Sequence, residues 1–486
     1  MKKNGFVTAL FVVAALVAVT ISVSASGGPP GGGFYSGQTL QNIGTSIANV
    51  NVDVYDSASS AKYTTSFTVS VGGAKTFFSS DVPGVPSGFQ GSAIVSSDQP
   101  LKAIVNVTNR QSGSNGIAGG TAAAQYNGLG TENTGTTVSF PLAKAGFGVK
   151  TTAFYIQNAG SAAATFTASF LMGTGLTDLS PVAYPYTSPS LAPGQMAVII
   201  PSDAGVPAGR IGSLSVTSAQ PLAGTVLEYE TTTAPAKILQ GTTGFTPSDY
   251  DTRILFPVMK KALGGRSTGL QVQNVAAGSV DVTMVYYGAG GTCPSGTFTE
   301  TVRTLASKQS TTYLDPAILP AGCLATAAAT GTGLIAGVVN EAYIPSVPAG
   351  QYQRATTYSA FPATTATAKV VAPVFKQAFG SKQTGLSIQN VGTSTATATA
   401  VFQVGATVYT YNNISIPAGG SFLFLDLANT SAYPNANWSG STRLPNSSLA
   451  AVTITSNQPI IAIANEAPLS AVIQDNINYS AFNVTP

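Results

Sequence analysis

Apolar and polar residues alternate along short stretches of the chain with the two-residue period of a half-buried β-strand. Val50, Val52 and Val54 alternate with polar neighbours, and the alternation returns over residues 280–286. Successive side chains of a strand point to opposite faces, so this pattern predicts strands with one buried and one solvated face. Beyond the N-terminal segment, no stretch has the spacing of an amphipathic helix. We therefore predict an all-β chain.

The chain repeats itself with a period of 116 residues. Gln-Asn dipeptides occur at 41–42, 157–158, 273–274 and 389–390, each followed closely by glycine. Because Asn and Gly tolerate a positive φ, each dipeptide predicts a hairpin turn before a strand. A period of this length matches one β-sandwich domain rather than a small solenoid unit. The predicted fold is four tandem Ig-like β-sandwich domains.

The period sets the predicted domain boundaries. Repeat 1 covers residues 34–125, repeat 2 covers 135–250, repeat 3 covers 251–366 and repeat 4 covers 367–486. Repeat 4 carries a loop insertion at residues 427–445, because this part of the chain is longer than its counterparts in the other repeats.

The N-terminus has the pattern of a secretory signal peptide. Lys2 and Lys3 precede an apolar run over residues 6–23, which ends in a small-x-small cleavage motif at Ala25. This pattern predicts that residues 1–25 are removed and that the protein is extracellular or at the cell surface.

Two alternatives for the N-terminus stay open. The apolar run is just long enough to span a bilayer, so an uncleaved anchor is one alternative. The other is a pilin-like leader that is cut between Gly5 and Phe6. Residues 26–33 are rich in glycine and proline and predict a short flexible linker to repeat 1.

The composition narrows the functions that such a scaffold can serve. Charged residues make up only 8% of the chain, the formal net charge is +3, and histidine is absent. A nearly neutral chain has no electrostatic footprint for nucleic acid. Without histidine, the usual Ser-His or Cys-His catalysis and His-ligated metal sites are excluded. We expect a protein that is not an enzyme, without cofactor or metal, and without a membrane partner once the signal is cleaved.

Two cysteines, Cys293 and Cys323, are the only ones in the chain. In an oxidising compartment they are expected to form a disulfide that closes a loop of about 30 residues and stabilises the fold by roughly 3–4 kcal/mol. Two unpaired buried thiols are the alternative.

Repeats 2–4 each place a lysine in the first strand and a glutamate late in the repeat, whereas repeat 1 has neither. Because charged residues are scarce, their joint presence and absence predicts cross-strand ion pairs. The predicted pairs are Lys144–Glu228, Lys260–Glu341 and Lys376–Glu466. Repeat 1 has Val107 in the place of the glutamate. Two independently solvated charges are the alternative.

In the mature chain, repeat 1 is predicted to lack its first strand. In repeat 2 this strand is predicted near residues 138–144, and one period earlier lie residues 22–28, in the cleavage region. An unpaired sheet edge accepts an added strand from another chain.

The C-terminal residues 479–486 stop where a fifth repeat would begin. They are therefore predicted to join the open edge of the next copy, head to tail, through Tyr479, Phe482 and Val484. A tolerated truncation of repeat 1 with a frayed C-terminus is the alternative.

The insertion in repeat 4 holds Tyr433, Arg443 and the only tryptophan, Trp438. Exposed aromatic side chains on a sandwich loop can stack on sugars or anchor a partner. We treat these three residues as a candidate ligand loop, with ordinary loop packing as the alternative.

Three segments of repeat 4 carry a resemblance to a known group: Pro373–Lys376, Thr384–Asn390 and Ala464–Glu466. The pattern resembles a group of largely uncharacterised secreted bacterial cell-envelope proteins built of tandem β-sandwich repeats. The resemblance extends over all four repeats, weakly in the first. It implies a surface location and a repeat scaffold, and it transfers no catalytic residue.

These features together predict a secreted, non-enzymatic structural protein of the cell surface, such as a surface-layer, sheath or filament subunit that associates with itself. The alternative is an adhesin or carbohydrate-binding protein that acts through the repeat 4 loop on a glycan or a surface protein.

Overall fold

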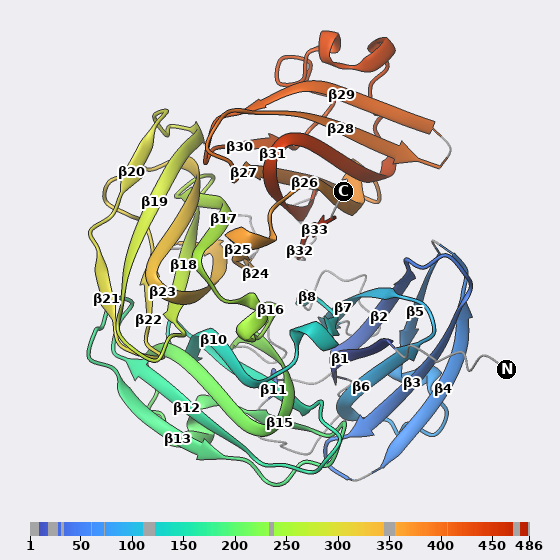
Figure 1. Ribbon diagram of the computed structural model, residues 1–486, viewed down its shortest axis with the longest axis vertical. Coiled ribbons are helices and arrows are strands. Elements are labelled where there is room, and N and C mark those ends of the chain that lie inside the picture. The colour runs from blue at the N-terminus through green and yellow to red at the C-terminus, as the bar shows by residue number, and fades with distance from the viewer. Residues whose placement is uncertain are drawn as a thin grey trace, which may run out of the picture. The chain divides into compact units, whose positions relative to one another are not determined.

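The chain is all-β in the computed structural model (Figure 1), as the alternation predicts. The structure describes residues 9–17, 28–30, 34–59, 61–71, 73–109, 122–232, 238–344, 355–405, 407–469 and 477–484. Within these ranges it contains strands and short 3-10 helices but no α-helix. None of the helices in the described part of the chain has the length and apolar character needed to cross a membrane.

The chain divides into two compact units, Met1–Asp249 and Tyr250–Pro486. Each unit contains two of the sequence repeats.

Unit 1 contains the strands of repeats 1 and 2. The strands of repeat 1 are β1 (Ala9–Val17), β2 (Phe34–Asn42), β3 (Ala48–Asp56), β4 (Lys62–Val69), β5 (Ala74–Phe78), β6 (Gln90–Ser97), β7 (Leu101–Asn109), β8 (Ala123–Asn127) and β9 (Leu129–Gly130). The strands of repeat 2 are β10 (Gly135–Ala145), β11 (Lys150–Asn158), β12 (Phe166–Gly173), β13 (Val182–Thr187), β14 (Met196–Ile199), β15 (Arg210–Glu230) and β16 (Leu239–Thr243).

Unit 2 contains the strands of repeats 3 and 4. The strands of repeat 3 are β17 (Asp251–Lys261), β18 (Arg266–Asn274), β19 (Val280–Gly291), β20 (Thr297–Thr299), β21 (Arg303–Leu305), β22 (Ser310–Tyr313), β23 (Cys323–Tyr343), β24 (Ala355–Ser359) and β25 (Phe361–Pro362). The strands of repeat 4 are β26 (Thr367–Gln377), β27 (Lys382–Asn390), β28 (Ala396–Val404), β29 (Thr407–Ile416), β30 (Ser421–Phe424), β31 (Ser448–Pro468), β32 (Ile477–Ser480) and β33 (Phe482–Asn483).

Short 3-10 helices lie in the connections. They are η1 (Ser79–Asp81), η2 (Thr131–Asn133), η3 (Pro201–Ala204), η4 (Pro247–Asp249), η5 (Ala363–Thr365), η6 (Asn435–Asn437) and η7 (Ser439–Ser441).

The strand pairing of repeat 1 shows the common plan. One sheet has the order β4-β3-β6-β1-β9 and the other has the order β5-β2-β7-β8. Residues from both sheets contribute to one buried cluster, as in a β-sandwich. Val50, Val52 and Val54 of β3 point into this core and are almost fully buried.

Repeats 2–4 follow the same plan with one difference, which is that β6 and β7 are replaced by one long strand. In repeat 2 this strand is β15, whose residues 210–218 pair with β10 and β12 and whose residues 222–230 pair with β11. The long strands β23 and β31 divide their pairing in the same way. Each long strand therefore links the two ladders of its repeat.

The two repeats of each unit pack tightly against each other. The core of repeat 1 continues into Tyr155 and Leu227 of repeat 2, and the core of repeat 3 continues into Ile461 and Ile463 of repeat 4. Burial of apolar side chains is the main favourable term in association. The paired repeats within a unit therefore form one packed body.

The same polar contact marks both of these junctions. Ser92 Oγ donates to the carbonyl of Gly194 at 2.6 Å, and Thr326 Oγ1 donates to the carbonyl of Gly419 at 2.6 Å. Both glycines have positive φ, 82° and 74°. A Cβ atom added at Gly194 would overlap the ring of Tyr55, so this backbone can approach its neighbour only as glycine.

The N-terminal segment supplies the first strand of repeat 1. Strand β1 pairs with both β6 and β9, in the place that β10, β17 and β26 take in the later repeats. The expectation that repeat 1 lacks this strand concerns the mature chain and stays a prediction, since residues 9–17 fill the position in the full chain. Residues 9–17 occupy the position, not residues 22–28, because residues 18–33 lengthen the connection to β2. The predicted cleavage site at Ala25 lies outside the described residues.

The C-terminal strands complete repeat 4 itself. Strand β32 pairs with β31, and β33 pairs with β26. Tyr479 is buried and its hydroxyl donates to the carbonyl of Val374, while the amide of Val484 donates to Lys369 O at 3.0 Å. Tyr479, Phe482 and Val484 are therefore paired within their own repeat, and their role as an assembly strand stays a prediction.

Candidate functional site

Repeats 2–4 each bury one glutamate between two basic side chains, and we call each trio a charge cluster. The structure brings together all three predicted pairs, with Nζ to Oε distances of 3.0 Å for Lys144–Glu228, 2.9 Å for Lys260–Glu341 and 2.7 Å for Lys376–Glu466. The second cations are Lys150 at 2.9 Å, Arg266 at 3.2 Å and Lys382 at 2.9 Å from the respective carboxylates.

A short hairpin positions the two cations of each cluster. In repeat 2, Lys144 lies near the end of β10, and Lys150 begins β11 after a four-residue turn. The turn includes Gly146, Gly148 and Val149 with positive φ, which brings the chain back within a few residues. The amide of Lys144 also donates to Thr152 Oγ1 at 3.0 Å, which fastens β10 to β11 beside the cluster.

The ion pair does not join direct neighbours on adjacent strands. Glu228 lies opposite Thr152 of β11, whereas Lys144 lies opposite Ile211 in the other part of β15. The predicted partners of all three ion pairs are therefore confirmed, and the contact links the two ladders of the repeat.

Burial and the neighbouring positive charges act in opposite directions on the pKa of the glutamate. The side chain of Glu228 is 5% exposed, and burial by itself raises the pKa of a carboxyl group. Lys144 and Lys150 more than offset this and lower the pKa of Glu228 to about 2. In repeat 3, Lys260 and Arg266 likewise overcome the effect of burial and lower the pKa of Glu341.

This arrangement keeps the carboxylate of Glu228 ionised at neutral pH, so the group is not suited to transfer a proton. A general acid or base at neutral pH needs a pKa near 7, whereas the pKa of Glu228 lies far below that value. Burial lowers the pKa of Lys144, and the carboxylate opposes that effect. The cluster acts as an electrostatic clamp between the two ladders.

Repeat 1 has apolar residues at the same positions. Val107 lies opposite Ser36 in the same register in which Glu228 lies opposite Thr152. Phe34 lies two residues before Ser36, and Lys150 lies two residues before Thr152. Phe34 and Val107 are completely buried. The charge cluster of the later repeats is therefore replaced by hydrophobic packing in repeat 1.

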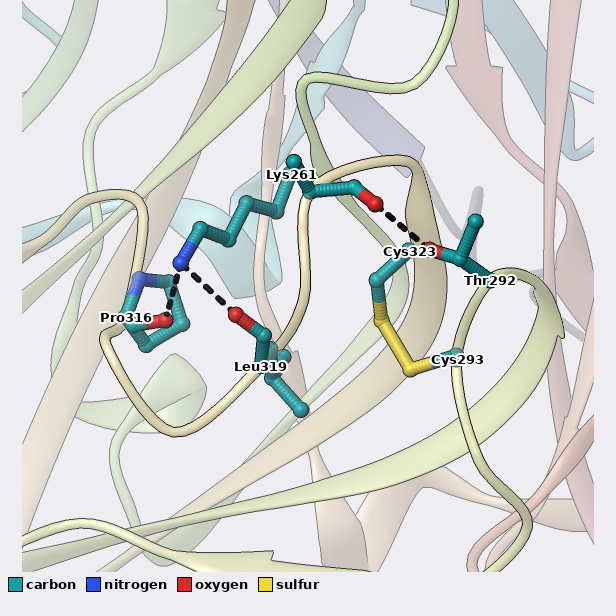
Figure 2. The surroundings of a disulfide bond; sticks show 7 residues. Lys261, Thr292, Cys293, Pro316, Leu319 and Cys323 are labelled. Carbon is teal, nitrogen blue, oxygen red and sulfur yellow. Dashed lines mark hydrogen bonds between the residues drawn. A yellow bond between two sulfur atoms is a disulfide. The ribbon is translucent and has the colours of Figure 1, made fainter.

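Cys293 and Cys323 form a disulfide in repeat 3, with Cα atoms 4.4 Å apart (Figure 2). Cys323 begins β23 and is fully buried, while Cys293 follows the end of β19. Beside it, Lys261 Nζ donates to the carbonyls of Pro316 and Leu319 at 2.8 and 2.7 Å. The disulfide and this lysine together hold the connection that leads into β23.

The candidate ligand loop of repeat 4 turns its aromatic side chains inward. Tyr433 and Trp438 are 5% and 3% exposed and belong to the core of repeat 4. The Trp438 ring lies 5.1 Å from the ring of Tyr411, measured between centroids. Arg443 donates to Asn435 Oδ1 at 2.8 Å. The prediction of exposed aromatic side chains that stack on a ligand is wrong, because the insertion covers and extends the repeat's own core.

No constellation of three or more Cys, Asp or Glu side chains that could hold a metal ion occurs within the described ranges. The functional features that the structure does present are the three charge clusters, the disulfide and the repeated junctions.

Comparisons with known proteins assign no family to the chain. No family model matches it, and no curated protein matches it. Among solved structures, Thermotoga maritima 1070 has 9% identity and a TM-score of 0.19, and the match covers 23% of this chain and 94% of that one. A tetra-tandem repeat from the extending region of a large adhesion protein has 12% identity and a TM-score of 0.10, covering 98% of this chain and 100% of that one. Similarities at these TM-scores carry no conclusion on function.

Proposed function

We propose that the protein is a secreted, non-enzymatic structural component of the cell surface, such as a surface-layer, sheath or filament subunit. In this proposal the four repeats are Ig-like β-sandwich domains, and the chain associates with itself. The observation that carries it is the repeated buried junction, in which Ser92–Gly194 and Thr326–Gly419 lie at equivalent places. Packed junctions make paired repeats stiff, which suits a building element better than a flexible string of binding modules.

The use of charge supports the same function. Charged residues are 8% of the chain, and nine of them are committed to the three buried clusters. A lightly charged surface rich in Ser and Thr favours lateral contact between copies, because it has little charge to repel them. The disulfide of Cys293 and Cys323 fits an oxidising, extracellular compartment.

The alternative of a carbohydrate-binding adhesin has lost its main support. It required exposed aromatic side chains in residues 427–445, and Tyr433 and Trp438 are buried.

Electron microscopy of the purified mature protein tests the proposal. We expect regular polymers or two-dimensional arrays at neutral pH, and fractionation of the source cells is expected to place the protein in the envelope. Isolated particles at all concentrations, or a protein confined to the cytoplasm, would contradict it.

A further inference from the structure

The two repeats of each unit meet through equivalent faces. In unit 2, Leu255 of β17 and Phe361 of β25 share one buried cluster with Ile463 of β31 in the next repeat. In unit 1, Leu129 of β9 likewise packs on Ala223 of β15 in the next repeat. Leu129 and Phe361 are equivalent, since each lies opposite the first strand of its repeat. We call the side of a repeat that carries Leu255 and Phe361 its leading face, and the side that carries Ile463 its receiving face.

Repeat 4 has a leading face that is apolar and open. Val371 takes the place of Leu255 one period later. Phe482 lies opposite Val371, in the register that Phe361 has in repeat 3. Leu449 extends this face along β31, where it alternates with inward-facing residues. Leu255 is completely buried, whereas Val371 and Phe482 are partly exposed and Leu449 is 43% exposed.

Repeat 1 has the matching receiving face. Ile104 of β7 takes the place of Ile463, since the two lie opposite equivalent residues of β2 and β27. Phe78 takes the place of Ile200, which packs from repeat 2 against the core of repeat 1. Ile463 is completely buried, but Ile104 is partly exposed, and Phe78 and Tyr35 on the same side are 45% and 43% exposed. Exposed apolar side chains gathered on one face mark an interaction surface.

We infer that the leading face of repeat 4 docks on the receiving face of repeat 1 of a second copy, and that this contact joins subunits head to tail. Each unit already contains one junction of this kind, and one chain carries a further copy of both halves, with both halves exposed. The two faces differ, so the contact is heterologous, and a heterologous contact that does not close extends into a filament. The inference rests on the proposed structural function, because it names the contact through which subunits join.

This contact is expected to be weaker than the junctions inside the units. Ala451 takes the place of Thr326 and has no hydroxyl to donate to a glycine carbonyl. Lys102 takes the place of Ile461, which makes part of the receiving face of repeat 1 polar. Smaller and more polar faces suit a contact between separate chains, because each chain has to stay soluble before it assembles.

Charge substitutions on the two faces test the junction. Leu449→Glu alters the leading face of repeat 4, and Phe78→Glu alters the receiving face of repeat 1. Both side chains are nearly half exposed, so both variants are expected to fold, which circular dichroism checks. Because a charge buried without a partner is costly, we expect each variant alone to associate at least about a hundredfold more weakly than the natural protein in sedimentation velocity. The matched control Leu179→Glu, at a similarly exposed position between β12 and β13, is expected to associate normally.

An equimolar mixture of the two variants tests the head-to-tail geometry. The Phe78→Glu chain keeps a natural leading face, and the Leu449→Glu chain keeps a natural receiving face. The mixture is therefore expected to form pairs that contain one copy of each variant, and nothing longer. A contact between two like faces, or closure of the two faces within one chain, predicts no such pairs.

Natural association of either variant alone, or a mixture that does not pair, would overturn the inference. Polymers seen by electron microscopy in the natural protein and equally in both variants would refute this junction and leave the proposed structural function standing. A natural protein that stays monomeric at every concentration would contradict both.

Discussion

The Nζ atom of Lys150 lies 2.9 Å from Oε1 of Glu228, and the Nζ atom of Lys144 lies 3.0 Å from Oε2 of the same carboxylate. One buried carboxylate is thus shared between two cations, and the cluster keeps one net positive charge inside repeat 2. Removal of one partner from a buried ion pair leaves a charge without compensation, and this is far more costly than loss of a surface pair.

Replacement of the shared carboxylate is expected to destabilise unit 1 strongly. Glu228→Gln leaves Lys144 and Lys150 close together and buried without the carboxylate that they share. We expect a loss of about 3–5 kcal/mol in the free energy of unfolding, measured by urea denaturation followed by circular dichroism. The matched control is Glu132→Gln at an exposed position, which is expected to change the stability by less than about 0.5 kcal/mol. Equal effects of the two substitutions would contradict the clamp.

Replacement of the whole cluster is expected to be tolerated. Repeat 1 shows that the same positions accept apolar residues, with Phe34 and Val107 fully buried. In the triple variant Lys144→Val, Lys150→Phe and Glu228→Val, the last two changes copy Phe34 and Val107 of repeat 1, and the first removes the remaining charge. Because it removes the desolvation cost together with the attraction, we expect it to be neutral or up to about 4 kcal/mol more stable than the natural protein. A loss as large as that of Glu228→Gln would show that the ions are themselves stabilising.

The clusters predict a specific loss of stability in acid. The folded pKa of Glu228 is about 2, below the ordinary value of 4.5, so ionisation favours the folded state above pH 4.5. This contribution, at most about 3 kcal/mol, disappears as the pH falls from 4.5 towards 2. Thermal melting followed from pH 7 to pH 2 measures it. The apolar triple variant is expected to lose less stability over this range, and parallel curves for both proteins would contradict the assignment.

The sequence predicted the partners of the clusters but not their full membership. The joint presence and absence of Lys144 and Glu228 among the repeats was enough to pair them. Lys150, Arg266 and Lys382 follow the same 116-residue period. This position is harder to recognise in the sequence, because its residue type changes between repeats although its charge stays positive. A second cation on one glutamate also departs from simple pairing, so only the folded geometry identifies it.

The differences between the predicted and the observed strands at the two ends of the chain have a common physical origin. A fixed period assumes that connections keep their length, and residues 18–33 break this assumption, so the first strand lies at residues 9–17 instead of 22–28. At the C-terminus, the period locates Tyr479 but cannot tell with which repeat it pairs, because strand pairing is non-local. Trp438 is a similar case, since a polar loop sequence does not reveal that its aromatic residue packs against Tyr411.

The junction between repeats 1 and 2 is expected to depend on the absence of a side chain at Gly194. This residue has φ of 82°, and an added Cβ atom would overlap the ring of Tyr55. Gly194→Ala therefore combines backbone strain with a steric clash, and we expect a loss of about 2–4 kcal/mol in urea denaturation. Gly205→Ala is the matched control, because Gly205 has φ of 75° and open space around its Cβ position, so only the strain of about 1–2 kcal/mol applies. Equal losses would mean that the contact with Tyr55 does not restrict the junction.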